Sequence, residues 1–227
     1  MENRVRKNNL VLIELFIYAL LPLVIWNYGR DIVGDYAAML ASTLPGLLYT
    51  IYRFIVDRQF NILGTFTLAS LALNTTVNLL SGSAEQMLWN GVYLSLFYLV
   101  LNLFFLVIRR PLSLYFAVDF AFLQGHDRKD SKALFFKKGI FKWFQIIQSV
   151  FVIRSIFLVT LTVYLLRQYG VEGYNSMLIY KQIVGWFFSI IITVLFFYTN
   201  VPIKKYLEKV DEGEGEEEQQ PSTQDGL

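Results

Sequence analysis

The sequence predicts an all-α fold, a polytopic transmembrane helical bundle of six spans with both termini in the cytoplasm. Of the 227 residues, 55% are apolar and only 17% are charged, and the mean hydropathy is +0.46, which is atypical of soluble domains. The charges are grouped in short segments between six mostly apolar runs. Runs of about 20 apolar residues match the roughly 30 Å thickness of a bilayer core.

The six runs divide the chain into two membrane units. A basic head, residues 1–9, precedes the first run, 10–26, which is long for the apolar part of a signal peptide and has no small-residue cleavage site after it. The other runs are 36–56, 62–81, 87–108, 144–166 and 183–201. We expect a four-span unit over 10–108 and a two-span unit over 144–205.

The distribution of basic residues predicts the orientation. Of the 20 Lys and Arg residues, 16 lie in the head, around the end of the second run, in the loop 109–143 and after the last run. The alternate turns hold only Arg30, Arg167 and Lys181. Because basic residues are retained on the cytoplasmic side, head, loop and tail are expected there, which requires an even number of spans.

The loop 109–143 contains an amphipathic stretch that predicts an interfacial cytoplasmic helix. Lys137, Lys138 and Lys142 form a basic patch, and Phe and Ile residues are interleaved with them. Lysines of such a helix contact anionic lipid headgroups while its aromatic residues enter the acyl boundary. Lysines interleaved with aromatic residues also occur in RNA-binding proteins. The adjoining membrane span explains the pattern without nucleic acid, so we expect none as a partner.

The tail, residues 206–227, is strongly acidic. From position 211 it reads DEGEGEEEQQPSTQDGL, with no apolar residue before the final leucine. A segment of this composition buries too little apolar surface to fold alone, so we expect disorder. The tail is then either a solvated extension or an acidic arm that contacts a basic partner.

Two ionisable residues lie inside predicted spans. Glu14 is about one turn into the first span, and Arg154 is near the middle of the fifth. A charge in hydrocarbon costs a few kcal/mol and usually faces the bundle interior or a partner. We therefore hypothesise an ion pair between Glu14 and Arg154 at matching depth. The alternative is that Glu14 extends to the interface and Arg154 binds amides or carbonyls.

The third and fourth spans carry an unusual number of polar side chains. Asn74 and Asn78 lie four residues apart in the third span, and Asn90 lies in the fourth. Side chains at this spacing share one helix face. With Glu14 and Arg154 they form a candidate intramembrane polar site. They either line a solute path or bond neighbouring helices, and the second use is the commoner one.

Sequence features of an enzyme are absent. The chain has no cysteine and one histidine, His126, and it contains no zinc-protease, phosphate-loop or nucleophile-elbow motif. We therefore predict no catalytic residue, no metal site, no cofactor and no enzymatic activity.

The first half of the chain resembles the bacterial inner-membrane proteins grouped around intracellular septation protein A. The matching residues are Arg30-Asp31-x-x-Gly34, Ser42-x-x-Pro45-x-x-x-Tyr49, Tyr52-Arg53, Asp57-Arg58, Gly64, Ser81-Gly82 and Arg110-Pro111-Leu112. The second half, with its basic loop and acidic tail, departs from that pattern. The resemblance implies a bacterial plasma-membrane protein linked to septation or envelope maintenance, and assigns no residue a role.

These observations lead to two functional hypotheses. The first is a non-enzymatic accessory or scaffold protein that contacts the lipid bilayer and a membrane-protein partner or a second copy of itself. The second is a small-solute or ion transporter whose polar residues line a path. A transporter requires a polar cavity at mid-membrane depth, whereas a scaffold uses these groups in helix contacts.

Overall fold

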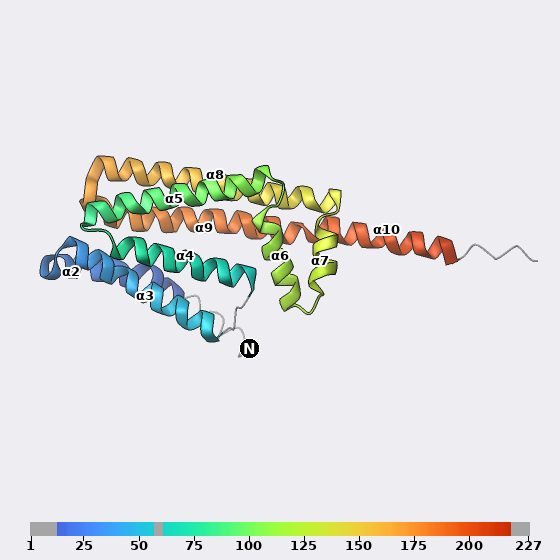
Figure 1. Cartoon of the computed structure of the whole chain (residues 1–227), viewed down its shortest axis with the longest axis horizontal. Coiled ribbons are helices and arrows are strands. Elements are labelled where there is room, and N and C mark those ends of the chain that lie inside the picture. Colours follow the sequence, from blue (N-terminus) through green and yellow to red (C-terminus); the bar gives the residue numbers. More distant parts are fainter. Residues whose placement is uncertain (1–12, 57–60, 219–227) are drawn as a thin grey trace, which may run out of the picture.

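In the computed structural model, which describes residues 13–56 and 61–218, the chain consists of helices and short turns, and the described residues include no strand (Figure 1). The prediction of an all-α fold is confirmed. A π-helical segment, η1, runs directly into α2, and a short 3₁₀ segment, η2, links α8 to α9. The elements are η1 Phe16–Leu20, α2 Leu21–Val33, α3 Asp35–Val56, α4 Ile62–Leu79, α5 Ala84–Val107, α6 Leu112–Leu123, α7 Arg128–Phe135, α8 Lys138–Tyr169, η2 Gly170–Gly173, α9 Tyr174–Tyr198 and α10 Asn200–Glu218.

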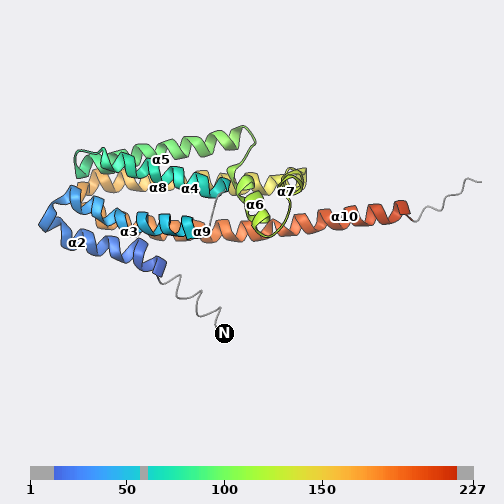
Figure 2. The same ribbon diagram turned by 60° about the horizontal axis from the view of Figure 1, so that its bottom comes forward.

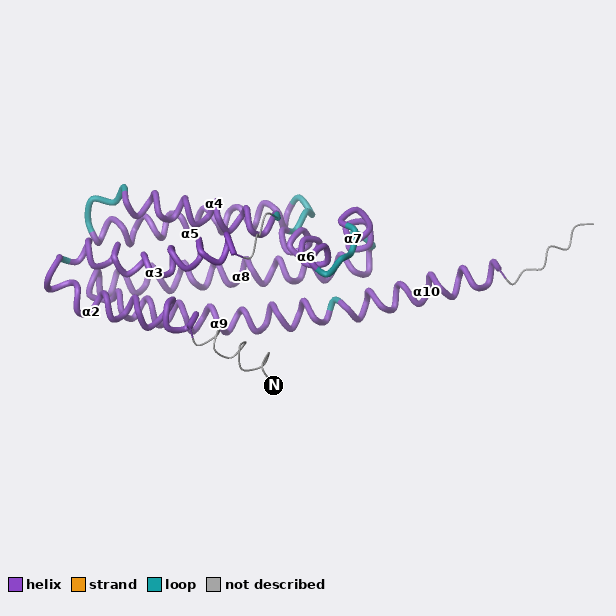
Figure 3. Tube along the Cα trace, turned by 90° about the horizontal axis from the view of Figure 1, so that it is seen from below, coloured by secondary structure: helices purple, strands orange, loops and turns teal. Residues whose placement is uncertain are grey.

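The long helices lie side by side along one axis (Figures 1 and 2). The turns that join α2 to α3, α4 to α5 and α8 to α9 all lie at one end, which we call the hairpin end. The short helices α6 and α7 lie toward the opposite end, the α6–α7 end. Beyond it, α10 continues the direction of α9 away from the bundle (Figure 3).

Local sequence signals start and stop these helices. The side chains of Asn61 and Ser83 accept hydrogen bonds from the amides of Gly64 and Gln86 in the first turns of α4 and α5, which satisfies donors that have no partner within the helix. Gly34 and Gly170 end α2 and α8 with φ angles of 81° and 55°. Residues with a Cβ rarely adopt such angles, so glycine permits both sharp turns.

Two buried clusters hold the bundle together, one toward each end. Toward the hairpin end, Trp26, Met39, Leu88, Leu166 and Met177 belong to a core shared by five helices. Toward the α6–α7 end, a second core is formed by Leu114, Val118, Phe135, Ile140, Phe144 and Ile147. This second core fastens α6 and α7 to the start of α8.

Four stretches of the described chain are long and apolar enough to cross a membrane. Three are the single helices α3, α4 and α5, and the fourth is Lys138–Val210, which contains α8 and α9 folded back on each other at η2. The predicted runs 36–56, 62–81, 87–108 and 144–166 each fall on one of the helices α3, α4, α5 and α8. The run 183–201 continues from α9 into α10, and the first run is described from residue 13 onward.

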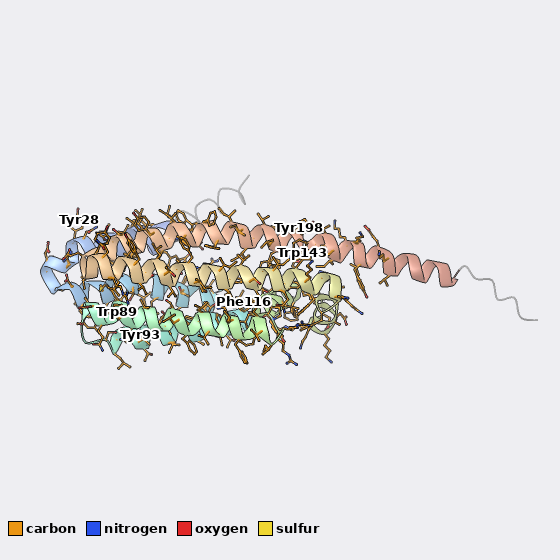
Figure 4. All side chains as sticks on the ribbon, turned by 90° about the horizontal axis from the view of Figure 1, so that it is seen from above. Tyr28, Trp89, Tyr93, Phe116, Trp143 and Tyr198 are labelled. Atoms are coloured by element: carbon orange, nitrogen blue, oxygen red, sulfur yellow. The ribbon has the colours of Figure 1, made fainter. Side chains whose placement is uncertain are left out.

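The outer surface of the bundle is rich in apolar and aromatic side chains, as expected for a multi-pass membrane protein. Tyr28, Trp89 and Tyr93 lie toward the hairpin end, whereas Trp143 and Tyr198 lie together toward the α6–α7 end (Figure 4). The rings of Trp143 and Tyr198 are 4.5 Å apart, centroid to centroid. Aromatic residues in two separated belts are typical of the two membrane–water interfaces.

The amphipathic stretch of the loop is arranged differently from our prediction of one interfacial helix. It is divided between the end of α7 and the start of α8. Phe135, Ile140 and Phe144 are buried against α6 and α7 instead of projecting toward lipid. The apolar side of this segment therefore serves the protein core, because the preceding apolar run folds into α6 and offers it a packing surface.

The described part of the acidic tail is helical. Helix α10 extends to Glu218, and the disorder expected for the tail stays a prediction. Glu and Lys are good helix formers, and α10 follows almost directly from α9, which spares the cost of starting a new helix. The prediction for residues 219–227 lies outside the described residues.

Candidate intramembrane polar site

Gln148 of α8 is the centre of a buried hydrogen-bond network. Its side chain is fully buried, and its Nε2 donates to the Asn102 side-chain oxygen over 2.9 Å and to the Asn102 carbonyl over 3.2 Å. Its Oε1 accepts a hydrogen bond of 3.2 Å from the backbone amide of Ser113. The Ser113 hydroxyl donates to the Phe144 carbonyl over 2.9 Å. One glutamine thus connects α5, α6 and α8.

Arg154 lies almost two turns further along α8, at the midpoint of that helix. It lines a cavity of about 290 Å³ between α4, α5, α6 and α8. The cavity is only partly enclosed, and Phe116, labelled in Figure 4, lines it from α6. Its lining residues are Phe66, Ser70, Tyr98, Asn102, Leu112, Phe116, Gln148, Phe151, Arg154 and Ser155.

The Arg154 side chain makes no hydrogen bond or ion pair with any other described residue, and its Nε is buried. The hypothesised pair with Glu14 is therefore not formed. The helix that carries Glu14 packs against α3 and α9, whereas Arg154 faces the cavity beside α5 and α6. Matching depth in the membrane does not determine which side of the bundle a residue faces, and this is why the pairing is wrong.

The asparagines predicted for the site have separate surroundings. Asn90 donates to the Ser81 hydroxyl over 2.9 Å, which ties the start of α5 to the turn before it. Asn74 is exposed and donates to the carbonyl of Ser70 in its own helix. The backbone carbonyl of Asn78 accepts from the hydroxyl of Tyr36 over 2.9 Å. None of Asn74, Asn78 and Asn90 lines the Arg154 cavity.

Asp119 is a buried carboxylate that sequence reasoning missed. It lies in α6 with 1% exposure, and its Oδ2 accepts a hydrogen bond of 3.0 Å from the amide of Leu63 at the start of α4. A guanidinium nitrogen of Arg128 lies 3.4 Å from its other oxygen. The signal in the sequence was a lone acid within the otherwise apolar run of α6. Asp119 caps α4 from a different helix, where the helix dipole favours a negative charge.

A second polar cluster lies at the hairpin end and joins α2, α3 and η2. The guanidinium of Arg30 in α2 donates two hydrogen bonds, of 2.6 and 2.7 Å, to the carboxylate of Glu172 in η2, and lies 3.2 Å from a carboxylate oxygen of Asp35. These contacts raise the pKa of Arg30 and lower that of Glu172, which lies in the turn between α8 and α9. Arg30 also covers the Trp26 ring at 4.8 Å, and that ring packs edge-on against Tyr174.

The basic patch lies at the α6–α7 end. Lys137, Lys138 and Lys142 are all exposed, and the ammonium group of Lys137 lies 5.7 Å from the centre of the Tyr206 ring in α10. The described part of the chain contains no group of three or more side chains placed to hold a metal ion.

Comparison of the chain with family models, with curated proteins and with solved structures gives no significant match.

Proposed function

We propose that this chain is a non-enzymatic multi-pass protein of the bacterial plasma membrane that acts as an accessory or scaffold protein through helix contacts. The observation that carries the proposal is the use of buried polar groups as connections between helices. Gln148 joins three helices, and the Ser42 hydroxyl is 2.9 Å from that of Tyr174 on another helix. Polar groups used in this way stabilise a rigid bundle and leave its outer surface for partners.

In this proposal the chain crosses the membrane six times, with both termini in the cytoplasm. Counting the N-terminal helix and treating α8 and α9 separately gives six helices, and three of the turns that link them lie at the hairpin end. Arg53 and the basic residues of the loop and of α10 lie toward the opposite end, which fits a cytoplasmic location for that end. The exposed basic patch supports contact with anionic headgroups on the same side.

The resemblance of the first half to the septation protein A group supports a role in septation or envelope maintenance. Partners of the proposed scaffold are lipids, another membrane protein or a second copy of this chain. The exposed apolar residues on the outer faces of the helices provide a surface for such contacts.

The topology is testable because the sequence has no cysteine. His126 at the α6–α7 end and Gln168 near the hairpin end are both exposed and suit replacement by cysteine. A membrane-impermeant thiol reagent added to intact cells should label Gln168→Cys but not His126→Cys, and should label both after the cells are lysed. Labelling of His126→Cys in intact cells would exclude the proposed orientation.

The scaffold role is tested by deleting the gene and restoring it with variants. We expect the deletion to alter septum placement or envelope integrity, and Arg154→Gln to restore both, because a scaffold does not require a charge in the cavity. A normal cell after deletion would contradict the link to septation and envelope maintenance.

Transport of a small solute or ion is a second candidate, and the cavity beside Arg154 favours it. The cavity brings a cationic group and several hydroxyl and amide groups to the middle of α8. In this case Arg154→Gln should fail to restore the deletion strain, although the variant protein reaches the membrane in normal amounts.

A further inference from the structure

The guanidinium of Arg154 is a strong hydrogen-bond donor without an acceptor in the described structure. Arginine carries five N–H donors and stays charged at all physiological pH values. None of the five donates to another described residue, and the Nε–H is buried. An uncompensated charge at this depth is unfavourable, so the site is incomplete without a negatively charged group.

The rest of the cavity offers donors and no competing acid. Hydroxyl groups of Ser70, Tyr98 and Ser155 line it together with Arg154, and no Asp or Glu is among the lining residues. The two lining amides, Asn102 and Gln148, are engaged with each other. The Tyr98 hydroxyl donates to the carbonyl of Ser70, the Ser155 hydroxyl donates to that of Phe151, and both can turn toward a ligand instead. The charge of the cavity is therefore positive.

The size and lining of the cavity suit a small polar group that is attached to an apolar one. About 290 Å³ is near the lower limit of ligand pockets. Phe66, Phe116 and Phe151 add apolar surface to the same lining. A second, more open hollow shares Phe66 and includes Arg128, so a second guanidinium lies along the same side of α4.

From this geometry we infer that the cavity binds an oxyanion, a phosphate or carboxylate group, with Arg154 as its charged anchor. A guanidinium bonds two oxygens of such a group at once, which a hydroxyl or amide does not do. The oxyanion is either the phosphate of a phospholipid headgroup or a free anion in the cavity. The inference does not depend on the scaffold role, because a scaffold and a transporter can both hold an anion there.

The experiment compares binding to delipidated protein of full length in neutral detergent. The probes are phosphatidylglycerol, phosphatidylcholine and inorganic phosphate, measured by native mass spectrometry and by the change in melting temperature. Arg154→Gln removes the charge but keeps hydrogen-bonding ability, and Arg154→Lys keeps the charge. The matched control is Arg167→Gln, which removes an exposed charge from the same helix outside the cavity.

We expect Arg154→Gln to weaken binding at least tenfold, Arg154→Lys to weaken it less, and Arg167→Gln to leave it unchanged. Binding of phosphatidylglycerol without a response to inorganic phosphate identifies a lipid as the source. A response to phosphate that requires Arg154 identifies a free anion. Ser155→Leu fills the cavity without changing the charge, so it should also block binding in a folded protein. Equal binding by wild type, Arg154→Gln and Ser155→Leu, or no binding of any probe, overturns the inference.

Discussion

Replacing Gln148 with leucine should destabilise the protein, because it removes the hydrogen bonds that join α5, α6 and α8. Leucine has a volume similar to that of glutamine and can fill the same buried space, so the change mainly removes hydrogen bonds. It leaves two groups without partners, the Ser113 amide and the Asn102 side-chain oxygen, at a buried junction of α5, α6 and α8.

The size of the effect follows from these two groups. In soluble proteins a buried polar group left unpaired costs about 1–3 kcal/mol. Hydrogen bonds between transmembrane helices contribute less on average, about 0.6 kcal/mol each. Because the Gln148 network lies where α6 covers the bundle, we expect an intermediate loss, about 2 kcal/mol in the free energy of unfolding.

Gln145 provides the matched control. It lies one turn earlier on α8, and its buried Nε2 has no hydrogen-bond partner among the described residues. Gln145→Leu should therefore leave stability unchanged or raise it slightly. Both variants are measured by reversible unfolding in mixed detergent micelles. An equal loss for Gln145→Leu and Gln148→Leu would refute the reasoning, because the Gln145 amide nitrogen has no hydrogen bond to lose within the described structure. The loss in Gln148→Leu could then not be attributed to its hydrogen bonds.

Three further changes test other parts of the fold. Glu172→Gln should lower the melting temperature at neutral pH, because it weakens the bonds to Arg30. Protonation of Glu172 in the wild type weakens the same bonds. The difference between the two proteins should therefore shrink below about pH 4 and vanish once the pH has fallen past the lowered pKa of Glu172. Asp119→Ala leaves the capped amide of α4 unpaired and should cost about 1–3 kcal/mol in unfolding experiments, whereas Asp119→Asn, which keeps an acceptor, should cost less. Gly173→Ala places a Cβ 2.8 Å from another side chain and should lower the melting temperature, whereas Gly91→Ala, with open space around it, should raise it.

Sequence reasoning located the helices because long apolar runs leave few alternatives in a membrane protein. It missed α6 because a run of 12 residues is too short to span a bilayer and was assigned to the loop. That helix then changed the role of its neighbours, since Ile140 and Phe144 pack on it. Whether an amphipathic segment faces lipid or protein depends on what else folds nearby.

The candidate site was predictable only in part. Arg154 stood out because a lone charge in an apolar run is conspicuous. Gln148 did not, since glutamines near the end of a span are common and its partners are 35 and 46 residues away in the sequence. The sequence also does not show which of Gln145 and Gln148 faces inward, because that depends on the packing of α8 against α5 and α6.

Arg30 and Arg154 show why the cavity at Arg154 is a site and not a structural connection. Arg30, at the hairpin end, has two carboxylates and an aromatic ring around its guanidinium, whereas Arg154 has no such partner deeper in the bundle. A structural charge is stabilised by its partners, so removing it destabilises the protein. Without an anion, Arg154→Met should instead raise the free energy of unfolding by about 1 kcal/mol, after allowance for the partial exposure of the side chain. Adding an anion that binds at Arg154 should make the wild type more stable than Arg154→Met, because only the wild type binds it. A loss of stability in Arg154→Met under anion-free conditions would instead mean that the guanidinium has a structural partner.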